Sequence, residues 1–128
     1  MAHTAAVVVV REFWRLMQSN DFHSVTAVLA DEFVLEWPQS KERILGGERF
    51  ARMNQEYPAH GAWKFTVRRL FGDNAEAVSE VEITDGVQNA RAISFFAVEL
   101  GKIVRVVEYW PEPYPPSLNR AHLVETME

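Results

Sequence analysis

Apolar residues near the N-terminus recur at intervals of three and four, the spacing of one face of a helix: Ala6, Val9, Val10, Phe13 and Met17. This pattern predicts an amphipathic helix over residues 5–18. The stretch "SND" interrupts it. Asp21 is placed to cap a second short helix that runs through Leu29.

The stretch "DEFVLEWP", residues 31–38, alternates between two faces and predicts a strand that Pro38 ends. Two glycines at 46–47 then open a third helix, and Pro58 stops it. One face of that helix carries Phe50, Met53, Asn54 and Tyr57. Between the strand and the helix, "WPQSKERILGG" reads as a long polar loop.

After Trp63 the alternation is that of strands, with the turn sequences "GDN", "DG" and "LGK" between them. The expected strands are residues 63–71, 75–84, 88–99 and 102–110. Helices followed by hairpin-linked strands predict an α+β fold. We expect one domain over residues 1–128, with three helices packed in a strongly curved, mixed or antiparallel sheet that forms a cone around a cavity.

The last expected strand carries a carboxylate in an apolar setting. Val104, Val106, Glu108 and Trp110 share one face, and Arg105 marks the other face as the outer or subunit-contact side. Glu108 is therefore expected to point inward. Buried carboxylates are rare without a partner. Glu108 is therefore either a structural group bonded to an Arg or a Tyr, or a residue that takes part in a reaction.

The strand over residues 75–84 also carries two acids. Its alternation sets Val78, Glu80, Glu82 and Thr84 against an apolar face, so periodicity sends both glutamates to solvent. The prolines from about residue 111 form a stiff tail that we expect to pack along the cone or across its mouth.

The amino-acid composition of the chain argues against several classes of function. A net charge of −5 without a basic block argues against nucleic-acid binding. The absence of cysteine excludes disulfides and thiolate chemistry, and fits a reducing cytoplasm. The apolar run "AAVVVV" is too short to span a membrane. No two of the four histidines have metal-ligand spacing, so we expect no metal, and nothing indicates another cofactor.

The order of elements, with "LADEFVLEWP" in the first strand and "GKIVRVVEYW" in the last, resembles the nuclear transport factor 2-like superfamily, and within it the SnoaL-like group. The resemblance covers nearly the whole chain. It implies a cone that hosts isomerases, cyclases, dehydratases, epoxide hydrolases and non-catalytic binding proteins, so it does not by itself decide the activity.

Residue matches to members of the family differ. Compared with ketosteroid isomerase, Trp37 stands at the catalytic Asp, while Phe13 and Ile93 stand near the oxyanion-hole Tyr and Asp. None of the three side chains supplies the group that this enzyme's proton transfer requires. That machinery is therefore not expected in this chain.

Limonene-epoxide hydrolase uses two aspartates bridged by an arginine. The resemblance places Glu108 at its last-strand acid, Glu82 at the second acid and Glu80 where the arginine should be. It therefore implies that Glu82 lies across from Glu108, and we give this more weight than the periodicity that sends Glu82 to solvent. Arg91 on the adjacent strand could replace that arginine. For polyketide cyclases of the SnoaL type, the resemblance implies one acid–base residue, a role that Glu108 could fill.

These matches give the candidate site. The catalytic candidates are Glu108, Glu82 and Arg91. The expected lining of an aromatic, apolar cavity for a small apolar or polycyclic molecule is Trp37, Phe50, Met53, Tyr57, Phe95, Val106 and Trp110. The alternative is a non-catalytic module in which Arg91 or Tyr57 neutralises Glu108. In either case the apolar outer sheet face, with Val107, Tyr109 and Phe96, predicts a homodimer.

Overall fold

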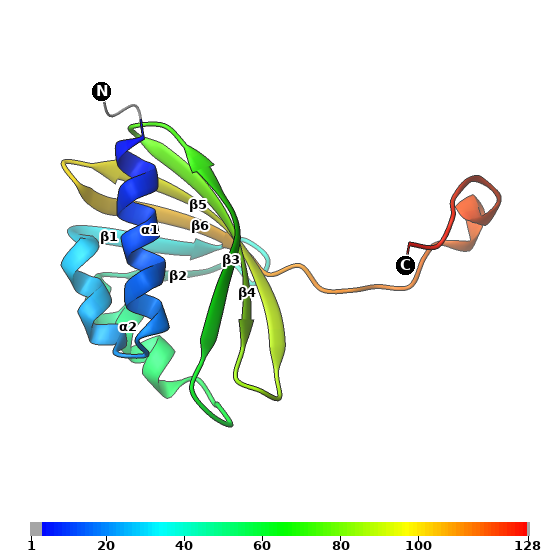
Figure 1. The fold of residues 1–128 in the computed structure, drawn as a ribbon, viewed down its shortest axis with the longest axis horizontal. Helices are drawn as coiled ribbons and strands as arrows, with labels where there is room; N and C mark the ends of the chain where they lie inside the picture. The colour runs from blue at the N-terminus through cyan, green and yellow to red at the C-terminus, as the bar shows by residue number, and fades with distance from the viewer. Residues whose placement is uncertain (1–3, 128) are drawn as a thin grey trace.

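The computed structural model describes residues 4–127 as two α-helices, two 3₁₀-helices and six strands. Helices α1 and α2 lie on the same side of a curved sheet (Figure 1). The elements in chain order are α1 Ala5–Gln18, η1 Phe22–Val28, β1 Leu29–Trp37, β2 Glu42–Leu45, α2 Gly47–Glu56, β3 Lys64–Gly72, β4 Glu76–Thr84, β5 Asn89–Glu99, β6 Lys102–Tyr109 and η2 Leu118–Leu123. The predicted α+β cone is confirmed.

The sheet has the strand order β2-β1-β6-β5-β4-β3. Strands β1 and β6 pair in parallel, and every other neighbouring pair is antiparallel, so the sheet is mixed. Strand β2 lies within the segment predicted to be a loop, and that prediction was wrong. The polar residues of β2 fit an edge strand, which needs no buried face: Ile44 is half-buried, and the other three residues are exposed.

The second helix also differs from its prediction. It is a 3₁₀-helix over Phe22–Val28, and Leu29 already belongs to β1. The side chain of Asp21 makes no capping hydrogen bond. Instead its backbone carbonyl accepts hydrogen bonds from the N–H and hydroxyl of Ser24. In contrast, Gly46 stands at the start of α2 with φ of 89°, a conformation that favours glycine.

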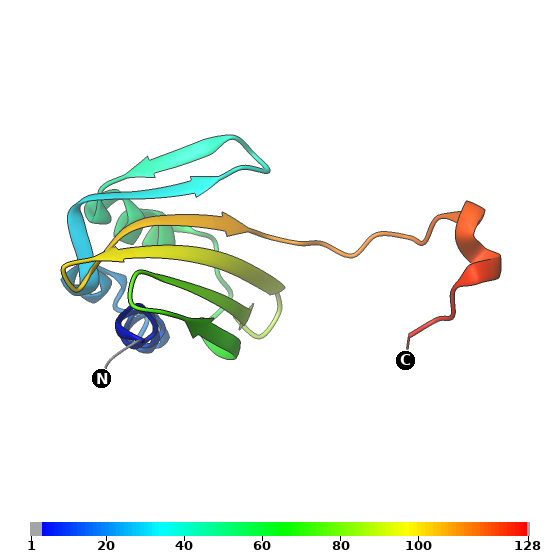
Figure 2. The ribbon, with the colours of Figure 1, turned by 90° about the horizontal axis from the view of Figure 1, so that it is seen from above.

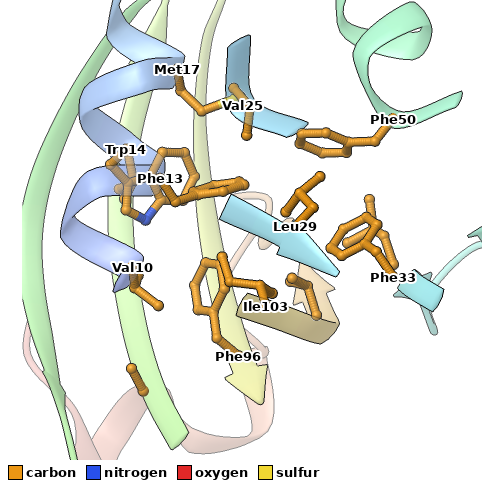
Figure 3. Close-up of a cluster of buried hydrophobic side chains, with 14 of the residues drawn as sticks. Val10, Phe13, Trp14, Met17, Val25, Leu29, Phe33, Phe50, Phe96 and Ile103 are labelled. Carbon is orange, nitrogen blue, oxygen red and sulfur yellow. The ribbon is translucent and has the colours of Figure 1, made fainter. Parts of the chain in front are cut away.

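The core lies between α1, α2 and the concave face of the sheet (Figure 3). Helix α1 buries Ala6, Val7, Val10, Phe13, Trp14 and Met17. Phe13 packs against the rings of Trp14, Phe50 and Phe96, with centroid distances of 4.9, 5.9 and 5.4 Å. The indole N–H of Trp14 donates to the hydroxyl of Ser79 at 3.0 Å, so a buried polar pair joins α1 to β4.

Residues 111–127, which we call the C-terminal arm, leave the sheet at the end of β6 and run away from it (Figures 1 and 2). Every residue of the arm is exposed. The expectation that this segment packs along the cone or across its mouth is therefore wrong. Four prolines within residues 111–116 favour a stiff, extended backbone, which directs the arm outward.

Candidate active site

The carboxyl group of Glu108 lies at the end of β6 on the concave side of the sheet. The prediction that it points inward is confirmed, since only 7% of the residue is exposed. Ser94 stands directly opposite on β5, and its hydroxyl donates to Oε2 of Glu108 at 2.6 Å. The indole N–H of Trp37, at the end of β1, donates to Oε1 at 3.0 Å.

Burial raises the pKa of Glu108, because the charged form loses its hydration. The hydrogen bonds from Ser94 and Trp37 stabilise the carboxylate and lower the pKa in part, yet the net shift is upward. Both donors are neutral groups, so no formal positive charge compensates for burial. A carboxyl group whose pKa is moved toward neutrality is suited to take up and return a proton.

Ser94 is the site residue that the sequence interpretation missed. It is fully buried and lies in the inward alternation of β5, between Ala92 and Phe96. A single small hydroxyl on the inner face of an apolar strand is the signal that could have identified it. Two-residue alternation also places it on the same face as an inward acid of the neighbouring strand.

The second predicted acid lies elsewhere. Glu82 is on the outer face of the sheet, where its carboxylate accepts two hydrogen bonds from Arg68, at 2.9 and 3.0 Å. Arg91 is on the same face and contacts both Glu82, at 3.3 Å, and Glu80, at 3.2 Å. The placement of Glu82 opposite Glu108 was therefore wrong. The solvent orientation given by periodicity is confirmed, since β4 turns its alternate residues outward.

Arg68 lowers the pKa of Glu82 through its hydrogen bonds and its positive charge, and this outweighs the opposite effect of partial burial. Glu82 is therefore a charged surface group rather than a proton donor. Arg91 does reach Glu82, but it does not bridge Glu82 to Glu108, because neither side chain lies on the side of Glu108. A relay of two bridged carboxylates is absent from this arrangement.

A groove between α2 and β2 has a volume of about 520 Å³, and Glu108 is not among the residues that line it. Trp37 belongs to its wall, so this one indole both lines the groove and hydrogen-bonds Glu108. The residues of this α2–β2 groove are Trp37, Glu42, Arg43, Ile44, Arg49, Arg52, Met53, Glu56, Tyr57 and Pro58. Three of the predicted lining residues, Trp37, Met53 and Tyr57, therefore share one concave surface.

The other predicted lining residues are dispersed, so the expectation of one cavity lined by all seven was wrong. Phe50 and Val106 are core residues, 5% and 2% exposed. Phe95 lies on the outer sheet face, 46% exposed, because alternation along β5 places it opposite to Ser94. The same alternation turns Phe96 into the core, 2% exposed, so the expectation that Phe96 lies on the outer face was wrong. Trp110 is half-buried just past β6, where its backbone N–H and carbonyl both bond the side chain of Gln39.

Neither structural partner proposed for Glu108 contacts it. Arg91 is on the outer face, and Tyr57 is 55% exposed and packs edge-on against Trp63, at a centroid distance of 5.9 Å. The three positions compared with ketosteroid isomerase are also separated. Phe13 is in the core, Trp37 lines the groove, and Ile93 is on the outer face.

A second buried carboxylate, Asp85, fixes the loop before β3 to the turn after β4. It accepts backbone N–H groups from His60, Val87 and Gln88, at 2.8, 2.9 and 2.6 Å. Burial would raise the pKa of Asp85, but these bonds, with the side chain of Gln88, hold it far below its usual range. The side chain of His60 is exposed, and its backbone N–H makes one of the bonds that hold this junction.

We expect the Asp85→Asn variant to be less stable than the wild type near pH 7 and to differ from it less as the pH falls. The folded-state pKa of Asp85 is depressed, so its contribution to stability is present above the unfolded-state pKa, about 3.9. That contribution is lost as the pH falls toward the folded value. Urea unfolding at pH 7 and pH 3 measures the effect. Asp31→Asn, at an exposed position of β1, is the control, and an unchanged Asp85→Asn difference at both pH values would contradict the prediction.

Within residues 4–127, no group of three or more His, Cys, Asp or Glu side chains could hold a metal ion. No helix in the same range is long and apolar enough to cross a membrane.

Comparison with family models matches residues 10–106 to the SnoaL-like domain. A search of curated proteins gives no match. Among solved structures, a candidate ketosteroid isomerase from Kribbella flavida is 35% identical, with a TM-score of 0.87. The match covers 97% of this chain and 90% of that one, so it continues into the C-terminal arm.

Two further structures place the fold in the same superfamily. An NTF-2 like protein of unknown function from Burkholderia xenovorans is 25% identical, covering 94% of this chain and 93% of that one, with a TM-score of 0.76. An epoxide hydrolase of M. tuberculosis is 26% identical, covering 85% of this chain and 84% of that one, with a TM-score of 0.68.

Proposed function

The chain belongs to the SnoaL-like family of the nuclear transport factor 2-like superfamily. On this premise we propose that it is an acid–base enzyme acting on a small apolar molecule. In this proposal Glu108 is the residue that transfers the proton. The observation that carries the proposal is the buried carboxyl group of Glu108, which has two neutral donors and a raised pKa. A structural salt bridge would instead pair it with a cation and lower that pKa.

The two hydrogen bonds leave part of the Glu108 carboxylate free to accept a proton from a substrate. A carboxylate has about four acceptor positions, of which Ser94 and Trp37 take two. These donors fix the orientation of the carboxyl group, so a proton from a bound substrate would meet a defined lone pair. Five of the ten residues that line the α2–β2 groove are aromatic or aliphatic and would contact an apolar substrate, and the other five are arginines and glutamates. Trp37 joins this groove to Glu108.

A single carboxyl group favours reactions in which one residue removes a proton and returns it, as in isomerisation or cyclisation. The epoxide-hydrolase relay needs a second acid, and Glu82 lies on the opposite face of the sheet. This chemistry draws on no cofactor. The proposed location is the cytoplasm, which suits a chain without cysteine.

The experiment is a thermal-shift screen of small apolar molecules, followed by turnover assays on each compound that raises the melting temperature. Chemical conversion of a bound compound that depends on the Glu108 carboxyl group supports the proposal. Compounds that bind without being converted would instead support the alternative, a non-catalytic binding protein of the same fold.

We also propose that two copies associate through the outer face of the sheet. Phe71, Val78, Phe95 and Val107 stand opposite one another on four successive strands, which makes an apolar row across the sheet. A shallow depression of about 550 Å³ crosses this row, lined by Ile93, Phe95, Val107 and Tyr109. We call these six residues the outer-face patch. An apolar centre surrounded by arginines and glutamates is the usual composition of a protein interface.

We expect Phe95→Glu to convert the dimer into a monomer. Phe95 is 46% exposed at the centre of the outer-face patch, and a buried, unpaired charge there would weaken association about a hundredfold or more. Sedimentation at micromolar concentration measures the effect. Val87→Glu, at an exposed position in the turn after β4, should leave the dimer intact. A monomeric wild-type protein would contradict this association.

A further inference from the structure

The C-terminal arm has a defined path but makes little contact with its own domain. Its root is held where the backbone N–H and carbonyl of Trp110 bond the side chain of Gln39, at 2.6 and 3.3 Å. Beyond Pro111 the arm runs outward from the sheet (Figure 2). Among residues 4–127, the only hydrogen bond given by a side chain of the arm is internal, from Ser117 to Asn119. The arm is therefore directed by its anchor and its prolines, and not by packing.

The end of the arm carries apolar side chains that its own domain leaves uncovered. The exposed fractions are 78% for Tyr114, 89% for Leu118, 75% for Leu123, 52% for Val124 and 92% for Met127. Three of these residues lie on or beside the 3₁₀-helix η2, Leu118–Leu123, which buries none of its residues. A six-residue 3₁₀-helix is not stable in water without tertiary contacts, so this segment needs a surface to fold against.

The position of the arm's root indicates which surface that is. Strand β6 supplies Val107 and Tyr109 to the outer-face patch, and the arm begins directly after it, at Pro111. A second copy docked on that patch therefore lies beside the point from which the arm extends. The structure matched from Kribbella flavida also continues into this segment, so the arm is shared by a relative rather than peculiar to this chain.

We propose that the C-terminal arm of each copy packs against the body of the second copy, as an exchanged arm that covers its apolar side chains. The inference rests on the proposed association through the outer-face patch, and it adds a second contact to that interface. Reciprocal exchange of a terminal segment strengthens a twofold dimer, because the same contact then occurs twice in the dimer. It is independent of the chemistry proposed for Glu108.

The lack of cysteine in the chain allows a direct test. The full-length Ala121→Cys variant is prepared without isotope label, and a nitroxide is attached to its cysteine. This spin-labelled variant is mixed with ¹⁵N-labelled wild-type protein so that the subunits exchange. We expect amide signals from the body of the ¹⁵N-labelled copy, which carries no nitroxide, to broaden. No broadening in a sample that sediments as a dimer would overturn the exchanged arm and leave the patch interface standing. A sample that sediments as a monomer would overturn both.

A second measurement does not depend on the label. The double variant Leu118→Ser and Leu123→Ser should raise the dimer dissociation constant about tenfold or more, because both leucines would lose buried area. Leu100→Ser is the matched control, since Leu100 is fully exposed in the turn between β5 and β6. An unchanged dissociation constant in the double variant would overturn the proposal.

Discussion

Replacing Glu108 with glutamine is expected to lower the turnover of a substrate by roughly 10²–10⁴-fold, the usual contribution of general acid–base catalysis, while the protein stays folded. Glutamine has nearly the shape of glutamate, and its side-chain oxygen can still accept the hydrogen bond from Trp37 or Ser94. It cannot exchange a proton in the neutral pH range. The rate falls because the carboxyl group that transfers the proton is lost, and not because the site unfolds.

The Glu108→Gln substitution is also expected to change how the free energy of unfolding depends on pH. Burial raises the pKa of Glu108 above its unfolded-state value, so the native state binds this proton more tightly than the unfolded chain does. The favourable contribution is complete below the unfolded pKa and is lost as the pH rises through the folded one. Glutamine removes this titration. We therefore expect Glu108→Gln to be at least as stable as the wild type near pH 8 and to show a flatter dependence of unfolding free energy on pH.

The measurements are turnover of a screened substrate and urea unfolding between pH 5 and pH 8. Glu82→Gln is the matched control: it makes the same change at an acid whose partner is Arg68 on the outer face, and it should leave turnover within about twofold. Its effect on stability should be small, since exposed ion pairs contribute about 0–1 kcal/mol. Full activity of Glu108→Gln, or equal losses in both variants, would contradict the assigned role.

Truncating Phe13 to alanine is expected to destabilise the protein by about 3–5 kcal/mol, the typical cost of removing a buried phenylalanine ring. Phe13 is 3% exposed and contacts the rings of Trp14, Phe50 and Phe96, so its loss opens a cavity where α1, α2 and β5 meet. Rigid secondary elements fill such a cavity only in part.

Chemical denaturation at pH 7 measures this loss. Val8→Ala is the control on the same helix, because Val8 is 58% exposed on the opposite side of α1. Its expected effect is within about 0.5 kcal/mol, as for most surface substitutions. A cost of less than about 1 kcal/mol for Phe13→Ala would mean that the three aromatic contacts do not form the centre of the core.

The fold followed from the sequence to the extent that it depends on local periodicity. The 3.6-residue pattern over residues 5–18 and the alternation after Trp63 located α1 and the strands β3 to β6 within a few residues. Strand β2 was not predicted, because an edge strand can carry polar residues on both faces and then shows no alternation of apolar and polar positions. The second helix was expected in the right place, but its 3₁₀ geometry depends on how it packs.

The site was predictable in part, for the same reason. Alternation alone oriented Glu108 inward and Glu82 outward, and both orientations are those of the structure. The likeness to a two-acid enzyme argued for moving Glu82 inward, and it was misleading, because a strand cannot turn one residue over without a bulge. Between β4 and β5 the register is continuous from Glu76 to Thr84.

The sequence by itself determined which face of each strand is apolar and which residue types were present for chemistry. Both depend on short-range periodicity. Only the tertiary structure decided that Ser94 and Trp37 meet Glu108, because these three side chains come from β5, β1 and β6, and strand order joins them. It also decided that the C-terminal arm leaves the domain. Long-range pairing and uncovered surface are properties of the assembled chain, and no local pattern encodes them.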